Sequence, residues 1–200
     1  MKDWNSLLDS VESTARSPLR PQMVIRALSD LMADDAGISL DCGANTHFAA
    51  RCIRLRENQR LTGTGMLASM APGVSFAIAA QLAYPRRQSV AVVGDGGFAM
   101  LMAELSTAIA HSLPIKIILL KNDRLAEVKF EQREIGNPEY GCDLQPIDFV
   151  AFARACGADG FRCTKPEEVR PRSKPRSALR DLRWLKPSWM SMRNPPNRTN

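Results

Sequence analysis

Two oxygen-bearing side chains follow two runs of β-forming residues and could share a cation. Asp95 comes directly after the apolar run 89–94, and Asn122 closes the apolar run 115–122. If both runs are strands of one open α/β sheet, their carboxyl ends meet where such sheets bind ligands. A carboxylate and an amide carbonyl are the hard oxygen ligands that Mg²⁺ prefers. We therefore expect Asp95 and Asn122 to form part of a magnesium site.

Glycines around Asp95 would suit a phosphate group. Gly94, Gly96 and Gly97 surround it where a predicted strand ends and a predicted helix begins. Glycine lets the backbone approach a ligand closely, and a helix N-terminus directs N–H donors toward it. Without other signals, such a turn is more often a plain connection between a strand and a helix. A diphosphate neutralised by magnesium would use both features.

The spacing of these residues resembles a known cofactor signature. The GDG motif at 94–96 is followed, after a gap of 24 residues, by Lys121 and Asn122. This resembles thiamine diphosphate enzymes of the pyruvate oxidase and acetolactate synthase type, in which GDG is followed at a similar distance by two asparagines. Lys121 stands where the family has the first of them. The resemblance implies that Asp95, Asn122 and the backbone carbonyl of Arg124 bind Mg²⁺.

Three further stretches agree with this resemblance. The segment 41–45, DCGAN, looks like the family's D-V-G segment, whose turn contacts the diphosphate. The segment 68–71, ASMA, is similar to the one whose large side chain, here Met70, props the cofactor in its bent conformation. Residues 130–132 and 146–153 resemble pyruvate oxidase stretches, the first near the substrate side. The implied cofactor-binding residues are Gly43, Ala44, Asn45, Ala68, Met70, Asp95, Gly96, Gly97 and Asn122.

Structural roles are the alternatives for several of these side chains. Asn122 could cap a helix, a role that does not exclude metal binding. Met70 alone would be interpreted as a core residue of an alanine-rich helix. Glu131 is a weak site candidate, while Glu127 and Lys129 are interpreted as solvated helix residues. The sequence assigns no catalytic residue.

The elements that must position these residues alternate along the chain. Periodicity and turn signals predict strands at 38–41, 89–94, 115–122 and 161–163, and helices at 21–33, 44–53, 69–85, 98–111 and 148–157. Such alternation predicts an α/β fold with a doubly wound parallel sheet and helices on both faces. Small apolar residues in the helix at 69–85 suggest that it is largely buried.

Composition separates a basic tail at 170–200 from the rest of the chain, in which the resemblance implies a thiamine diphosphate-binding domain at 21–169 after a tail at 1–20. The formal net charge is +6. The last segment holds nine Lys or Arg and one acid, which leaves 18 basic and 20 acidic residues before it. The basic charge therefore belongs to the tail, and we expect no nucleic-acid binding. Salt-sensitive binding through that tail stays open as an alternative.

The tail at 170–200 differs from the ending that the resemblance implies. The family continues with a helix and a final buried strand, whereas this tail is rich in Arg, Pro and Trp. We expect it to be disordered and the last strand of the sheet to be missing. Permitted codons read in another frame encode a family-like helix, turn and strand. We therefore hypothesise a one-base frameshift near Arg170, which the codons of the gene would refute if they forbid that reading.

The resemblance implies the decarboxylation of pyruvate or a similar 2-oxo acid, with a partner. Family enzymes bind the cofactor between this type of domain and a pyrimidine-binding domain of a neighbouring subunit, which supplies an activating glutamate. No part of this sequence resembles that second domain. We expect an oligomer with a subunit or chain that carries it, and little activity alone. The alternative is a truncated, inactive remnant that only binds cofactor or a partner subunit.

Hydropathy, the opening residues and the cysteines indicate where in the cell the protein is located. No apolar run reaches the length of a membrane span, and the opening residues do not resemble a signal peptide. The five cysteines show neither zinc-site spacing nor a disulfide framework. We expect a cytoplasmic protein that does not associate with membranes.

Overall fold

The computed structural model describes residues 4, 6–7, 9–10 and 19–169 of the 200-residue chain. The expectations of a disordered tail at 170–200, of its frameshift and of the missing strand lie outside these residues. Within the described part, no helix is both long and apolar enough to cross a membrane.

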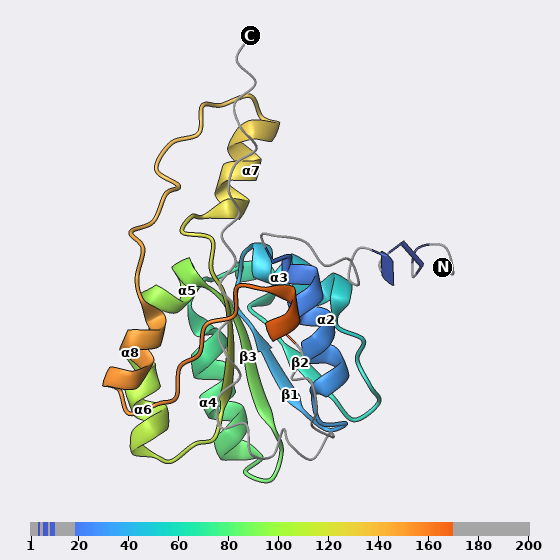
Figure 1. Ribbon diagram of the computed structural model, residues 1–200, viewed down its shortest axis with the longest axis vertical. Helices are drawn as coiled ribbons and strands as arrows, with labels where there is room; N and C mark the ends of the chain where they lie inside the picture. The colour runs from blue at the N-terminus through green and yellow to red at the C-terminus, as the bar shows by residue number, and fades with distance from the viewer. Residues whose placement is uncertain (1–3, 5, 8, 11–18, 170–200) are drawn as a thin grey trace.

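The described residues form one parallel sheet of four strands. These are β1 (Gly37–Leu40), β2 (Arg60–Thr62), β3 (Ser89–Gly94) and β4 (Lys116–Leu120). Their order is β2-β1-β3-β4, with every neighbouring pair parallel (Figure 1). Every residue of β4 and all but the last of β3 are buried, as expected for strands covered on both faces. The predicted α/β class is confirmed.

Helices cover both faces of this sheet (Figure 1). Val90 and Val92 of β3 pack into one core, and the alternating Ala91 and Val93 pack into the other. The first core includes α2 (Pro21–Leu31) and α3 (Ala44–Cys52); the second includes α4 (Pro72–Ala83), α5 (Asp95–Met100), α6 (Glu104–Ala110) and α8 (Phe149–Ala155).

Sequence signals explain where two of these helices begin and end. Pro21 opens α2 at a position where its missing N–H costs nothing. Asp148 caps α8, because its side chain accepts the N–H groups of Val150 and Ala151, each at 3.1 Å. Gly157, with φ of +85°, follows the end of that helix.

Three predicted elements differ from the structure. The helix predicted at 69–85 begins only at Pro72 and is buried along one side, since Leu82 and Tyr84 are exposed. The helix predicted at 98–111 is two helices, α5 and α6, separated by a turn at 101–103. The strand predicted at 161–163 is wrong, because only Cys163 takes part in a β-bridge. The sequence signals also missed β2 and the 3₁₀ helix η1 (Gly65–Leu67). The helical interpretation of Glu127 and Lys129 agrees with α7 (Ala126–Glu134), and the helical start that KPEEV at 165–169 indicates is the 3₁₀ helix η2 (Pro166–Glu168).

The segment 126–141, named the arm here, projects from the body of the domain (Figure 1). It comprises α7 and the loop that follows. Its two ends are joined by an antiparallel bridge between Arg124 and Asp143 and by a 2.7 Å hydrogen bond from the Leu125 N–H to the Cys142 carbonyl. The arm therefore leaves the domain and returns to it at nearly the same place.

Candidate cofactor site

Asp95 lies at the end of β3, where α5 begins, and its carboxylate joins two strand ends. Its Oδ2 accepts the N–H groups of Asn122 and Asp123, at 3.0 and 2.6 Å, and its Oδ1 accepts that of Gly96 at 3.0 Å. Burial raises the pKa of Asp95, while these N–H donors and the charge of Lys121 act in the opposite direction. The loop after β4 is thus held directly against the predicted metal ligand.

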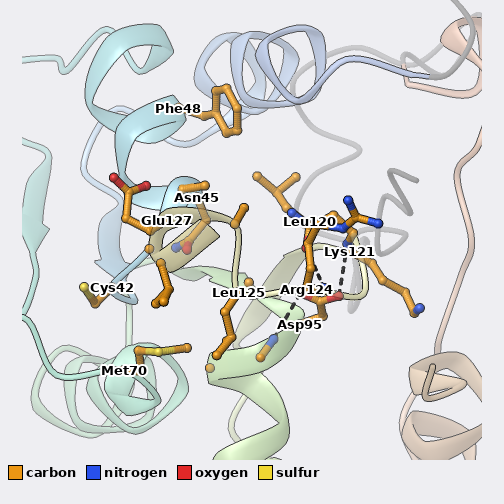
Figure 2. A pocket seen from close by; sticks show the side chains of 18 of the residues that line it. Cys42, Asn45, Phe48, Met70, Asp95, Leu120, Lys121, Arg124, Leu125 and Glu127 are labelled. Carbon is orange, nitrogen blue, oxygen red and sulfur yellow. Dashed lines mark hydrogen bonds between the residues drawn. The ribbon is translucent and has the colours of Figure 1, made fainter. Parts of the chain in front are cut away.

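Asn122 and Arg124 lie on that loop; the Asn122 N–H contacts Asp95, and Figure 2 shows Arg124 close to the same residue. The Asn122 Oδ1 accepts the Arg124 N–H at 3.2 Å, which forms a tight turn around Asp123. Asp123 has φ of +56° and makes an ion pair with Lys121. Burial lowers the pKa of Lys121. The three predicted metal-binding residues are therefore brought together by one carboxylate and one turn.

A pocket opens beyond these strand ends, and most of the predicted cofactor-binding residues line it. Two of the candidates do not. Ala68 is exposed and belongs to the turn before α4, and Glu131 is exposed on α7. The candidates that line the pocket are Gly43, Ala44, Asn45, Met70, Asp95, Gly96, Gly97, Asn122 and Arg124.

Glycines leave the room that this pocket needs. A Cβ on Gly96 would lie 2.9 Å from Leu125 Cδ2 and 3.5 Å from Met70 Cε, so a side chain there would displace the pocket wall. Gly43 has φ of +127°, a conformation that other residues rarely adopt. The backbone at both positions can therefore come close to a bound group.

Asn45 holds the two central strands together at the pocket. Its Nδ2 donates to the carbonyls of Asp41 and Val92, at 3.3 and 3.1 Å. These bonds connect the end of β1 to β3 and direct the amide hydrogens toward the sheet. The side chain therefore shapes the pocket wall, and sequence reasoning alone did not suggest this role.

Met70 reaches the pocket from an irregular turn. This turn joins η1 to α4, so Met70 is not the core residue of a helix that its sequence context allowed. Figure 2 shows Met70 and Leu125 at the same side of the pocket, and both lie against Gly96. An apolar side chain therefore stands beside the glycines of the turn, where it can contact the organic part of a ligand.

The base of the arm contributes charged residues that the sequence interpretation missed. Glu127 lines the pocket and pairs with His47 of α3, with 3.2 Å between Nδ1 and Oε2. Lys129 is buried and pairs with Glu139, so its interpretation as a solvated residue is wrong. No sequence pattern links His47 to Glu127, because the pair joins two helices far apart in the chain.

The donor set at the strand ends suits a hard cation that shares its coordination with a phosphate. In the described part of the chain, no three His, Cys, Asp or Glu residues cluster as a metal site. The predicted site instead uses one carboxylate, one amide oxygen and one backbone carbonyl. Mg²⁺ is commonly held by one or two carboxylates with the remaining positions taken by water and ligand phosphates. The residues present therefore fit a magnesium diphosphate.

Comparison with known proteins identifies the same region. A family model described as thiamine pyrophosphate enzyme, C-terminal TPP binding domain, matches residues 41–176. This range contains every residue of the predicted site. It begins at the end of β1 and includes all of β3 and β4.

Three similar proteins are matched over most of this chain and over about a third of their own length. YdaP of Bacillus subtilis, described by name as a thiamine pyrophosphate-containing protein, is 42% identical over 171 residues, 86% of this chain and 30% of its own. A pyruvate oxidase of Lactiplantibacillus plantarum is 32% identical over 84% of this chain and 28% of its own. An acetolactate synthase isozyme 3 large subunit of Escherichia coli is 31% identical over 92% of this chain and 32% of its own. The chain thus spans about a third of the length of these relatives.

Proposed function

The chain belongs to the family of C-terminal TPP-binding domains of thiamine pyrophosphate enzymes, and we propose that it binds thiamine diphosphate through Mg²⁺. The observation that carries this proposal is the joining of two strand ends by Asp95. Its carboxylate holds the loop that presents Asn122 and Arg124. Metal binding by Asp95, Asn122 and the Arg124 carbonyl is part of the proposal.

The chain's own residues divide the work of holding the cofactor. Gly43, Ala44, Gly96 and Gly97 offer close backbone approach to the diphosphate, and Asn45 keeps the strand ends in place. Met70 faces the organic part of the cofactor. When bound, thiamine diphosphate supplies the carbanion-stabilising chemistry that 2-oxo acid reactions need.

The substrate and the partner belong to the proposal as well. Because two of the similar proteins are a pyruvate oxidase and an acetolactate synthase, we expect a pyruvate-like 2-oxo acid. We also expect an oligomer in which a partner subunit or chain supplies the pyrimidine-binding domain. The arm supports this, since its base lines the pocket and it exposes Phe130, Ile135 and Tyr140 farther along. Apolar side chains of this kind are suited to an interface.

Calorimetric titration of the purified chain with thiamine diphosphate, with and without Mg²⁺, tests the proposal. We expect binding that needs the metal and is lost in Asp95→Ala. Asp159→Ala, which removes an exposed carboxylate outside the pocket, should bind like the wild type. Thiamine diphosphate binding that does not depend on Mg²⁺, or that is retained in Asp95→Ala, would contradict the metal assignment.

Two further outcomes separate the proposal from its alternative. A folded wild-type chain that binds no cofactor in Mg²⁺ would refute binding by this chain alone. A chain that binds the cofactor but does not consume pyruvate, even with a subunit that carries the pyrimidine-binding domain, would favour a remnant that only binds. Circular dichroism of each sample establishes that the chain is folded.

A further inference from the structure

Asp41 is a buried carboxylate that the proposed cofactor contacts do not use. It follows β1, is 1% exposed and is not among the residues that line the pocket. Its Oδ1 accepts the N–H of the adjacent Cys42 at 2.9 Å and that of the distant Ala71 at 2.6 Å. The second of these bonds attaches the turn that carries Met70 to the end of the sheet.

That turn needs such an attachment, because its backbone is strained. Ala68 has φ of +46° and Ala71 has φ of +88°, a region that residues with a Cβ avoid. Pro72 then begins α4 and has no N–H to donate. The hydrogen bond from Ala71 to Asp41 thus holds a conformation that the turn would not prefer alone.

The other carboxylate oxygen of Asp41 is closely packed on the opposite side. Its Oδ2 has no hydrogen-bond partner among the described residues. A Cβ on Gly97 would come within 1.8 Å of this oxygen, so the carboxylate lies tightly against the first turn of α5. Gly73 of α4 also lies against Asp41, although less tightly, because a Cβ there would lie 3.3 Å from Asp41 Cβ. The side chain is therefore fixed between α4 and α5.

This packing gives Asp41 a connection to both sides of the pocket. On one side it touches the turn that presents Asp95 and Gly96, and on the other it fixes the turn that presents Met70. Burying a carboxylate with so few partners costs free energy. Burial indeed raises the pKa of Asp41. A group kept at such a cost is a candidate for a functional role.

We propose that Asp41 is a positioning residue that clamps the turn at Ala71 and thereby sets how far Met70 reaches toward the bound cofactor. This proposal rests on the proposed binding of thiamine diphosphate. It predicts that Asp41 acts through Met70 on the organic half of the cofactor and leaves the grip on the diphosphate unchanged.

The first experiment observes the clamp without any ligand. We would record the ¹³C-methyl resonances of the methionines in the wild type, Asp41→Ala and Asp41→Asn. In Asp41→Ala, the Met70 methyl should shift toward its unfolded-chain position, while that of Met32, buried in the opposite core, should stay. Asp41→Asn keeps an acceptor oxygen for Ala71 and should largely retain the wild-type resonance. An unmoved Met70 resonance in Asp41→Ala would overturn the proposal.

The second experiment compares two probes in Mg²⁺, thiamine diphosphate and inorganic diphosphate. We expect Asp41→Ala to bind thiamine diphosphate about tenfold more weakly, the scale of one lost charge-assisted hydrogen bond, and inorganic diphosphate as the wild type does. In a Met70→Ala background, Asp41→Ala should have no further effect. Ser39→Ala, which alters a buried polar group within β1, the strand that precedes Asp41, is the control.

The two experiments distinguish the two proposals. Equal losses for both probes in Asp41→Ala, or full additivity with Met70→Ala, would mean that Asp41 only stabilises the fold. A wild type that binds neither probe would refute the proposed function, while the methyl resonances would still decide whether Asp41 holds Met70.

Discussion

Residues 95–97 of the pocket and Asp41, which packs behind them, are together named the floor here. The floor and the arm at 126–141 hold their carboxylates in opposite ways. In the floor, burial raises the pKa of both Asp41 and Asp95, and backbone N–H groups are their main partners. In the arm, hydrogen bonding by Lys129, joined by Arg133, lowers the pKa of Glu139. The floor also consists almost wholly of buried residues, whereas the arm is largely exposed.

The carboxylates of the floor therefore lack full charge compensation, whereas the carboxylate of the arm already has basic side chains beside it. Carboxylates held without full charge compensation oppose folding at neutral pH, and a bound cation would relieve that cost. The arm gains from its acid in the free protein. The comparison teaches that the carboxylates of the floor are buried with little charge compensation, while that of the arm is stabilised by basic side chains.

The sharpest test of the comparison replaces Phe98, which directly follows the floor in α5, and Phe130 of the arm. Phe98 is 4% exposed and makes edge contacts with Phe149 and Phe152, at 5.2 and 6.4 Å between ring centres. Phe98→Ala should lower the free energy of unfolding by about 3 to 5 kcal/mol, as expected for a buried aromatic. Phe130 is 51% exposed on the arm, and Phe130→Ala should cost less than about 0.5 kcal/mol. Urea unfolding followed by circular dichroism measures both, and similar losses would mean that the arm is part of the core.

A smaller loss is expected when the floor is overfilled. Gly97→Ala places a methyl group within 1.8 Å of the Asp41 carboxylate, so the free energy of unfolding should fall by about 3 kcal/mol. Gly63→Ala is the matched control, because its added carbon would lie 3.8 Å from the nearest atom, at ordinary contact distance. Thermal unfolding reports both effects. Equal stability of the two variants would show that the floor can relax.

The two regions should respond to acid with opposite signs. The folded-state pKa of Asp41 is raised, so its contribution to stability is present below its unfolded pKa and is lost as the pH rises through the folded value. The folded-state pKa of Glu139 is lowered, so its contribution is present above its unfolded pKa and is lost as the pH falls.

Hydrogen exchange between about pH 3 and 7, corrected for the intrinsic rate, measures this contrast; that interval brackets ordinary carboxyl pKa values. Lowering the pH should slow the corrected amide hydrogen exchange around residues 95–97 and accelerate that of α7. Glu139→Gln should remove the acid response of the arm, and Asp41→Asn should weaken that of the floor. A change of the same sign in both regions would contradict the comparison.

The smallest effect is expected where the arm meets α3. The Nδ1 of His47 lies 3.2 Å from the Oε2 of Glu127, and the histidine side chain is largely exposed. His47→Ala should therefore change the free energy of unfolding by less than about 0.5 kcal/mol. The substitution should act locally and accelerate the hydrogen exchange of the first amides of α7. A global loss of stability would mean that the contact between His47 and Glu127 stabilises the whole domain and not only the attachment of the arm.

The same two regions differ in how well their sequence predicts them. Strong apolar runs predicted β3 and β4, and a glycine turn predicted the position of Asp95. Those signals are local and follow from strand burial. The arm has no such pattern, and although Glu127 and Lys129 are interpreted as helix residues, the sequence does not predict the bounds of α7. The burial of Lys129 depends on Glu139, which the chain brings back only after a loop.

Contacts between distant segments explain the other misses. Asn45 belongs to a helix by its local sequence, but its amide bonds the carbonyl of Val92 in a neighbouring strand. The turn at Met70 was predicted as helix because its small residues favour one. The bond from Ala71 to Asp41, 30 residues earlier, is formed only in the folded domain. Propensity describes neither interaction, since both depend on tertiary packing.

The joined ends of the arm have a consequence for how this domain can vary in length. The bridge between Arg124 and Asp143 closes the segment at its base, before the chain continues to α8. Residues added to or removed from its tip need not move the sheet. For a flexible loop, doubling the length costs only about 0.6 kcal/mol in closure entropy. The arm is therefore the natural place to insert a reporter sequence or to exchange segments between relatives while the strand ends keep their geometry.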